Sequence, residues 1–382
     1  MSRILVSLCF LPVLAAAPRA KFIEHTLATD LRGGYQVVVA DLNHDGKPDL
    51  IALASGMPEL VWYENPGWQR HVLATGVSRM INCVAVPVDG EPIPEIVLAS
   101  EFANEAKNSV GIVSVIRHQG DPREPWKVTE IDRLTTSHRL RLADIDGSGK
   151  KVVINQPLTG ANAAAPDYRD QTPLVYYRPG EWKRQTISTE NSGVVHGIFI
   201  VDWEGKGRDS ILTASFTGIH RFQLGKDGKW TRNEIAKGDP APWPKSGSSD
   251  IAVGHLGKAR FIAAIEPWHG EQVSVYREQG GKWDRMVIDT SLVDGHTIAV
   301  ADLNGDGLGE IVAGYRGKGR SVNLYYADDV KGDHWSRQVL DDGGMAAAAC
   351  AVADLNGDGR PDIVCIGSAT TNLKWYENAG PN

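Results

Sequence analysis

One acidic turn recurs along this chain and restricts its fold more than any other feature. Its clearest copy, Asp302-Leu-Asn-Gly-Asp-Gly307, lies between two short apolar runs at 298–300 and 311–313. Short apolar runs rich in β-branched residues and bounded by glycine favour buried strands over a helix. The turn recurs in complete or eroded form at residues 41, 87, 144, 202, 255, 302 and 354. A period of about fifty residues without a long helical pattern predicts a β-propeller rather than several independent domains.

A second motif predicts that each of the seven blades has four antiparallel strands. Six units end on an aromatic residue that opens a short strand, as at 68–73 and 335–340. The seventh unit lacks this strand, whereas residues 22–27 near the N-terminus fit the pattern. We therefore expect the N-terminal strand to complete the last blade, which closes the ring and removes open strand edges. The predicted fold class is all-β, with residues 21–382 as a single propeller.

Residues 1–20 differ from the repeats. Arg3 precedes an apolar run from Ile4 to Leu14, and small residues follow that run. A charged start, a short apolar middle and a small-residue cleavage site predict a secretory signal peptide. The run is too short to span a bilayer. We therefore expect a secreted or periplasmic protein without a membrane span after cleavage.

Charge and cysteine content exclude some classes of protein. The formal net charge is −7, and an acidic exported protein without a basic patch is not expected to bind nucleic acid. Beyond the predicted signal peptide the cysteines are Cys83, Cys350 and Cys365. This odd, sparse set is not a disulfide framework, so we expect buried free thiols. The sequence leaves the oligomeric state open.

The acidic turns carry oxygen ligands at the alternating spacing that a hard cation such as Ca²⁺ or Mg²⁺ requires. Strand-like flanks argue against an EF-hand. In a propeller these turns lie on the face opposite the channel mouth, so we predict structural cations rather than catalytic ones. The predicted ligands are Asp41, Asn43, Asp45 and Asp49 in unit 1, Asp302, Asn304, Asp306 and Glu310 in unit 6, and Asp354, Asn356, Asp358 and Asp362 in unit 7.

Three histidines occupy one position of the repeat, six residues before the acidic turn. His138, His196 and His296 belong to units 3, 4 and 6, and Tyr35 holds this position in unit 1. Because the inner strands surround a narrow channel, we expect these side chains to meet at its mouth. Imidazoles there suit a catalytic Zn²⁺ ion or a general base. We assign His138 as the base, Tyr35 as an acid, and His196 and His296 as holders of Zn²⁺ or of an oxyanion. The alternative is that each histidine only bonds a neighbouring loop.

Loops on the same face carry the groups of a sugar-binding site. Aromatic rings stack on the apolar faces of sugars, and carboxylates, amides and cations bond the hydroxyl groups. Each of these residues could instead be a solvated loop residue. The predicted substrate-binding residues are Glu101, Lys107, Arg139, Tyr168, Arg169, Trp243, Lys245, Glu266, Trp268, His269 and Arg316.

These motifs resemble two known groups of propellers. Over all seven units the chain resembles FG-GAP/VCBS repeat propellers, which implies the fold and cation sites but not a function. The segments 137–140, 194–197, 239–250 and 293–297 resemble the propeller domain of the aldos-2-ulose dehydratases. That resemblance implies a lyase that eliminates water from keto-sugars such as 1,5-anhydrofructose or glucosone, with a histidine base and metal ions. The family also carries cupin domains, whereas this sequence ends with the propeller units.

The predicted function is therefore a carbon–oxygen lyase acting on a keto-sugar. A carbonyl acidifies the neighbouring C–H bond, a histidine removes that proton, and a metal ion or other cation stabilises the enolate while a β-hydroxyl leaves. The alternative is a non-catalytic propeller that binds a glycan or a protein. Such a module has no need for three imidazoles at the channel mouth.

Overall fold

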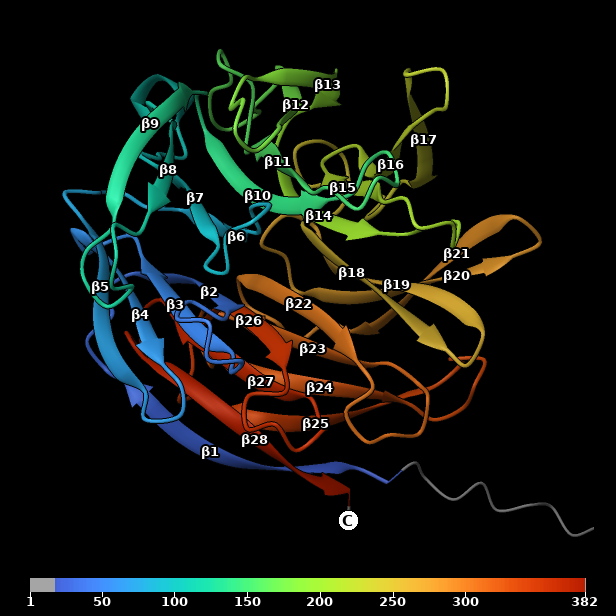
Figure 1. The fold of residues 1–382 in the computed structure, drawn as a ribbon. Helices are drawn as coiled ribbons and strands as arrows, with labels where there is room; N and C mark the ends of the chain where they lie inside the picture. The colour runs from blue at the N-terminus through green and yellow to red at the C-terminus, as the bar shows by residue number, and fades with distance from the viewer. Residues whose placement is uncertain (1–17, 382) are drawn as a thin grey trace, which may run out of the picture.

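The computed structural model describes residues 18–381, which form seven four-stranded antiparallel sheets arranged as a β-propeller (Figure 1). The predicted fold class is thus confirmed. Most of the predicted signal peptide, residues 1–17, lies outside the described residues. None of the helices in the described part of the chain has the length and apolar character needed to span a bilayer.

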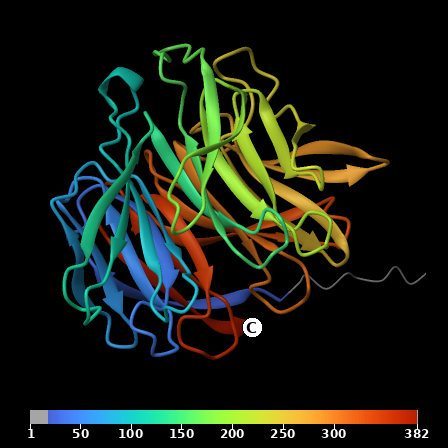
Figure 2. The same ribbon diagram turned by 45° about the horizontal axis from the view of Figure 1, so that its top comes forward.

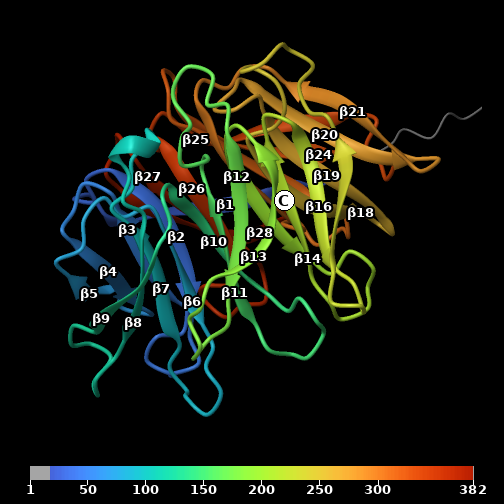
Figure 3. The ribbon, with the colours of Figure 1, turned by 90° about the horizontal axis from the view of Figure 1, so that it is seen from above.

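Six blades each use four consecutive strands, running from the channel outward. Blade 1 contains β2 (Gly34–Ala40), β3 (Asp49–Ala54), β4 (Glu59–Glu64) and β5 (Gln69–Thr75). Blade 2 contains β6 (Asn82–Val86), β7 (Glu95–Ser100), β8 (Ile112–Arg117) and β9 (Lys127–Arg133). Blade 3 contains β10 (Ser137–Ala143), β11 (Val152–Pro157), β12 (Gln171–Tyr177) and β13 (Gln185–Ser192). A short 3-10 helix, η1 (Ala106–Asn108), lies in the loop between β7 and β8 and is the teal coil in Figure 3.

The second half of the ring repeats this order. Blade 4 contains β14 (Val195–Val201), β15 (Ser210–Ser215), β16 (Gly218–Leu224) and β17 (Trp230–Ala236). Blade 5 contains β18 (Asp250–Leu256), β19 (Ala259–Glu266), β20 (Gln272–Gln279) and β21 (Lys282–Asp289). Blade 6 contains β22 (Gly295–Ala301), β23 (Glu310–Tyr315), β24 (Ser321–Ala327) and β25 (Trp335–Asp342). Blade 7 contains β26 (Ala347–Ala353), β27 (Asp362–Gly367), β28 (Leu373–Pro381) and, as its outer strand, β1 (Ala20–Ala28).

The N-terminal strand closes the ring as predicted. In Figure 2 the blue β1 runs beside the red β28, and the antiparallel pairing places His25 opposite Trp375. The strand begins at Ala20, whose side chain is 1% exposed. This pairing covers the edge of β28, which would otherwise be open to other chains.

The second strand of each blade forms the centre of the apolar core. All residues of β3, β15 and β27 are buried, because neighbouring blades cover both faces of each sheet. Strands buried on both faces are expected to be continuously apolar, which explains the short runs in the sequence.

The acidic turns connect the first and second strands of their blades, at the opposite end of the inner strands from the histidines. The Asp302 carboxylate accepts backbone N–H bonds from residues 305–307, and Gly307 adopts a φ of 82° that favours glycine. In each complete copy, the carboxylate that opens the second strand accepts a further backbone bond across the turn. These bonds join Leu42 to Asp49 at 2.9 Å, Leu303 to Glu310 at 2.6 Å and Leu355 to Asp362 at 3.0 Å. The carboxylates thus stabilise the turns, and cation binding there stays a prediction.

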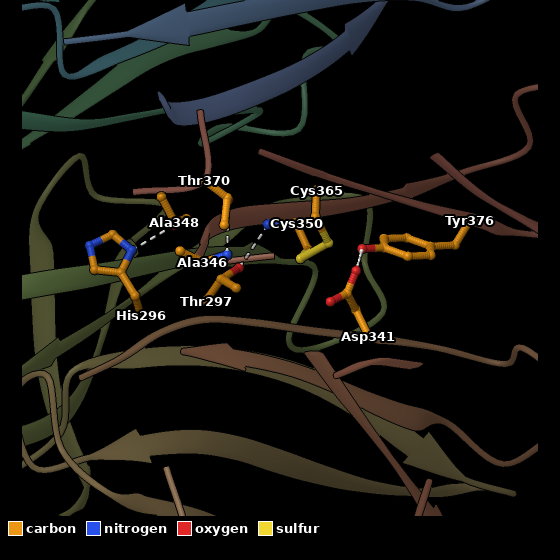
Figure 4. Close-up of a disulfide and its surroundings, with 9 residues drawn as sticks. All are labelled: His296, Thr297, Asp341, Ala346, Ala348, Cys350, Cys365, Thr370 and Tyr376. Atoms are coloured by element: carbon orange, nitrogen blue, oxygen red, sulfur yellow. Dashed lines mark hydrogen bonds between the residues drawn. A yellow bond between two sulfur atoms is a disulfide. The ribbon is translucent and has the colours of Figure 1, made fainter. Parts of the chain in front are cut away.

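Two of the three cysteines form a disulfide, so the expectation of three free thiols was wrong. Cys350 in β26 and Cys365 in β27 are directly opposite each other, with Cα atoms 4.1 Å apart (Figure 4). Strand register brings together two residues whose spacing in the sequence carries no disulfide signal. Cys83 is free and buried, as expected, and burial raises the pKa of its thiol to about 12.

Candidate functional site

Four histidines meet at one mouth of the channel. The expected convergence of His138, His196 and His296 is present, and His269 from the loop after β19 joins them. Ring centroids are 5.0 Å apart for His138 and His196 and 5.0 Å for His196 and His296. His269 lies 4.9 Å from His196 and 5.1 Å from His296. The sequence placed His269 among the substrate-binding residues because it lies outside the repeat position that the other three share.

The backbone explains why these side chains turn toward the mouth. Tyr35, His138, His196 and His296 are each the second residue of an inner strand. At each of them the pairing register with the second strand shifts, so the residue lies outside the ladder. Such bulges redirect side chains and are frequent beside active sites.

Hydrogen bonds orient two of the histidine rings. Nδ1 of His296 donates to the carbonyl oxygen of Ala348 at 2.5 Å (Figure 4). Nδ1 of His269 lies 3.2 Å from a carboxylate oxygen of Asp294, which Arg316 also bonds at 2.9 Å. Burial opposes ionisation of Asp294, but the bonds from His269 and Arg316 lower its pKa to about 2. The bond to Ala348 fixes the proton of His296 on Nδ1 and leaves its Nε2 unprotonated. The Asp294 carboxylate beside Nδ1 favours the same tautomer of His269, and such a carboxylate–histidine contact is typical of the shell around a metal site.

Three of the histidines can share one metal ion. Ligand nitrogens of His196, His269 and His296 lie within 4.8 Å of one another. The Nε2 atoms of His196 and His269 are 3.3 Å apart, and Nε2 of His296 is buried without a hydrogen-bond partner among the described residues. Tetrahedral Zn²⁺ with bonds of about 2.05 Å places neighbouring nitrogens roughly 3.3 Å apart. These residues therefore fit a three-histidine zinc site with one open position.

His138 has a different partner. Its Nε2 lies 2.8 Å from the hydroxyl oxygen of Tyr35, and its ring packs against Phe102 with centroids 5.3 Å apart. Burial, reinforced by the positive charge of Arg139, holds the pKa of His138 well below its usual range. Burial also raises the pKa of Tyr35. A neutral imidazole bonded to a neutral phenol can pass a proton in either direction.

Two arginines flank the cluster. Nε of Arg139 donates to the carbonyl oxygen of His196 at 3.0 Å, and its Nη2 lies 3.4 Å from Nε2 of the same histidine. Nη2 of Arg316 lies 3.3 Å from Nδ1 of His269. Burial and these guanidinium groups hold the pKa values of His196 and His296 well below their usual range. The histidines are therefore neutral near pH 7, as a metal ligand or a general base must be.

A cavity of about 420 Å³ lies over the histidines, within the usual size range of small-molecule sites. Tyr35, Trp268 and Arg316 line it, as predicted. Arg79 and Phe102 line it as well, although the sequence did not single them out. Arg79 lies in the loop that enters blade 2, and Phe102 lies in the loop between β7 and β8. Both loops are on the face of the mouth, and this location is the signal in the sequence that could have identified them.

An aromatic group borders the cavity. The ring of Phe216 lies 5.1 Å from Trp243 and 5.7 Å from Trp268, and Tyr168 lies 5.6 Å from Trp268. The guanidinium of Arg169 stacks over Trp243 at 4.6 Å. The predicted aromatic residues thus gather on one side of the mouth, with Trp268 lining the cavity itself.

Glu266 does not lie in a loop at the mouth, which corrects its predicted position. It ends β19 with 0% exposure. Its carboxylate accepts bonds from the Ser248 hydroxyl at 2.7 Å, from Nε of Arg285 at 2.7 Å and from Tyr276. Because both carboxylate oxygens are occupied inside blade 5, the geometry indicates a structural role.

Seven other predicted substrate-binding residues also lie outside the cavity lining, and three of them are Tyr168, Arg169 and Trp243 of the aromatic side. Glu101 pairs with Arg79 and so contacts the cavity indirectly. Lys107 in η1 and Lys245 in the loop between β17 and β18 are exposed. Arg139 lines the channel below the histidines.

Family comparisons agree with the repeat. The model of the aldos-2-ulose dehydratase β-propeller domain matches residues 110–279, a segment that contains His138, His196 and His269. FG-GAP-like and FG-GAP repeat models match residues 302–365 and 33–57. The chain is 27% identical over 237 residues to aldos-2-ulose dehydratase from Phanerodontia chrysosporium. That match covers 54% of this chain and 26% of the relative, so it spans about a quarter of the relative's length.

Solved structures share the fold at low identity. An Agrocybe aegerita lectin that recognises non-reducing terminal N-acetylglucosamine has a TM-score of 0.53 and 14% identity, covering 86% of this chain and 92% of that chain. The extracellular domain of a one-component system from B. thetaiotaomicron has a TM-score of 0.55 and 12% identity, covering 94% of this chain and 40% of that one. At these identities the likeness concerns the fold alone.

Proposed function

We propose that this chain is a carbon–oxygen lyase that eliminates water from a keto-sugar such as 1,5-anhydrofructose or glucosone. The observation that carries the proposal is that the four histidines have two different environments. His138 is bonded to Tyr35, whereas His196, His269 and His296 direct nitrogens toward a common point. Elimination next to a carbonyl requires a base, an acid and a positive charge at the carbonyl oxygen. A proton-transfer pair beside a cation site supplies these groups. Similarity to the propeller domain of an aldos-2-ulose dehydratase supports the substrate class.

The three-histidine set would hold Zn²⁺, which supplies Lewis-acid polarisation of the substrate carbonyl when bound. Arg316 beside His269 adds positive charge near the oxygen that becomes the enolate. The ordered contact from Arg316 through Asp294 to His269 keeps this histidine in one orientation. Its Nε2 is therefore directed at the cavity throughout the reaction.

His138 and Tyr35 perform the proton transfers. Nε2 of His138 accepts the proton from the carbon beside the carbonyl, and the electrons of that C–H bond form the enolate. The enolate then collapses, the bond from the β-carbon to its hydroxyl breaks, and Tyr35 donates the proton that makes the leaving group water. The imidazolium returns a proton to the tyrosinate across their 2.8 Å contact, which restores both groups.

The aromatic side of the mouth would orient the sugar. The ring of Trp268 lines the cavity and can stack on the apolar face of a pyranose. Arg79 and Asn104 line the same cavity and can bond hydroxyl groups. In this proposal the sugar lies between the aromatic side of the mouth and the histidines.

The test is ultraviolet absorbance of the zinc-loaded protein incubated with 1,5-anhydrofructose or glucosone. We expect a conjugated enone to form with wild type and to be lost in His138→Ala. Lys107→Ala, an exposed change outside the cavity, is the matched control and should retain the reaction. If folded, zinc-loaded wild type forms no enone from either sugar, the proposal fails.

A non-catalytic glycan-binding propeller is the second candidate, favoured by the aromatic group of Trp243, Trp268 and Tyr168 beside the cavity. In that case sugars would quench tryptophan fluorescence without forming an enone. Sugar binding would then be lost in Trp268→Ala and would be unchanged in His138→Ala.

A further inference from the structure

A second cavity of about 430 Å³ lies inside the channel, deeper than the histidines. All seven inner strands contribute to its wall, through residues at the histidine position or up to four places after it. Valine, isoleucine and alanine make up most of this wall. The cavity above is lined by histidines, arginines and aromatic residues, so the two cavities are suited to different ligands.

Two arginines of β10, Arg139 and Arg141, line this lower cavity. Nε of Arg139 donates to the carbonyl oxygen of His196 at 3.0 Å, and Nη1 of Arg141 donates to that of Leu140 at 2.9 Å. Both bonds go to neutral oxygens. In the described part of the chain, neither guanidinium has a carboxylate oxygen within 4.0 Å. Two guanidinium groups therefore line a mostly apolar part of the channel, and neither makes a direct ion pair.

Asp250 on β18 lines the same cavity and compensates only part of this charge. It accepts a bond from its own neighbour, the Ile251 amide, at 3.1 Å. It also packs so closely on Gly197 that a Cβ there would lie 2.7 Å from its Oδ1. The formal charge of the three groups is 2 − 1 = +1. Burial, together with the positive charge of Arg139, lowers the pKa of Arg141 to about 10, and Asp250 offsets only part of this effect.

We propose that the lower cavity binds a small organic monocarboxylate, with its carboxylate at Arg139 and Arg141 and its apolar part against the inner strands. Buried charges are normally paired, and the planar fork of a guanidinium matches a carboxylate. Ile198, Phe199 and Val300 line the same cavity and can supply apolar contacts to the ligand. The proposal does not rest on the proposed elimination, because its ligand is an anion at the inner strands rather than a neutral sugar at the histidines. The two sites adjoin at Arg139, which also bonds His196.

The test is isothermal titration of the full chain with benzoate, at constant ionic strength and without sugar. Benzyl alcohol, which has a similar shape and no charge, is the matched ligand. We expect saturable benzoate binding that weakens about tenfold or more in Arg141→Gln, since a charge-assisted bond is lost. Asp250→Asn should bind benzoate more tightly, because it removes the negative charge beside the arginines.

Three controls locate the binding. Arg32→Gln changes an exposed arginine and should leave benzoate affinity unchanged. His296→Ala should also leave it unchanged, which separates this cavity from the zinc site. Arg141→Lys keeps the positive charge but loses the planar fork of the guanidinium, and we expect it to bind benzoate more weakly than wild type. This variant tests the proposal if Arg141→Gln does not fold. Three outcomes would overturn the proposal. The first is that folded wild type does not bind benzoate, and the second is that it binds benzoate and benzyl alcohol equally well. The third is that wild type and both Arg141 variants bind benzoate equally well.

Discussion

The hydroxyl oxygen of Tyr35 lies 2.8 Å from Nε2 of His138, although 103 positions separate the two residues and blade 2 lies between their blades. Only the closed ring makes this contact, because both residues stand on bulges at the same end of inner strands. No short segment of the sequence therefore contains both residues or predicts their contact. It is also the contact on which the proposed proton transfers depend.

Tyr35→Phe keeps the ring and removes the hydroxyl. We expect kcat for enone formation to fall about 10²-fold with little change in KM, since the proton donor is lost while the cavity keeps its shape. Initial rates of absorbance change measure the effect. Tyr63→Phe, which removes a buried hydroxyl within the core of blade 1, is the control. An unchanged kcat in Tyr35→Phe would exclude this tyrosine as the acid.

Asp294→Asn should weaken zinc binding about 10- to 100-fold, because His269 loses the carboxylate that orients it. Competition with a coloured zinc chelator gives the affinity without any substrate. Asp342→Asn alters an exposed carboxylate at the end of β25 and should not change zinc affinity. Equal zinc affinity in wild type and Asp294→Asn would contradict the three-histidine site.

Glu266→Gln tests the structural role assigned to this carboxylate. Losing the charge leaves Arg285 with only its longer carboxylate contact, to Asp239 at 3.4 Å, and we expect the free energy of unfolding to fall by about 3 kcal/mol. KM for the sugar should stay within about twofold of wild type, because no substrate contact is removed. Urea unfolding and steady-state kinetics measure the two effects. A raised KM with unchanged stability would instead place Glu266 at the substrate.

Removing the disulfide should destabilise blade 7. For the sequence separation of 15 from Cys350 to Cys365, chain entropy predicts a loss of about 3 kcal/mol on reduction. Guanidinium unfolding with and without reductant measures it. The double variant Cys350→Ala and Cys365→Ala is the control, and reductant should not shift its midpoint. A wild type that is insensitive to reductant would argue against a stabilising cross-link.

The buried His220 makes stability fall in acid. Burial, assisted by Arg232, lowers its pKa to about 4, whereas the unfolded chain has about 6.5. The unfolded state thus binds more protons between these values. The contribution of His220 is complete above pH 6.5 and is lost as pH falls toward 4, by up to about 3 kcal/mol.

The measurement is the free energy of unfolding at pH 7.5 and pH 4.5 for wild type and His220→Leu. The buried channel histidines act in the same direction, so the comparison between variants isolates His220. We expect a smaller loss on acidification in His220→Leu. His334→Gln, an exposed change, should behave as wild type. Identical pH dependence in wild type and His220→Leu would refute this assignment.

Repetition explains how much of the structure was predictable. The acidic turn and the aromatic strand start recur with a fixed offset, so aligning them revealed seven blades, the closing strand and the shared position of His138, His196 and His296. Residues outside the repeat offered no such alignment. His269 joins the metal-binding group because it lies in a loop whose path the sequence does not reveal. Glu266 lies inside blade 5 rather than in the loop, because β19 continues as far as this residue.

The sequence by itself determined the all-β architecture, the number of blades, the ring closure and the end of the channel where the histidines lie. Short apolar strands and glycine turns are local properties, and a local property repeated seven times defines a ring. The tertiary structure alone decided which nitrogens face each other, which carboxylates are occupied and which cysteines pair. These outcomes depend on contacts a few ångströms long between blades, and strand register and bulges set such distances only after the ring has closed.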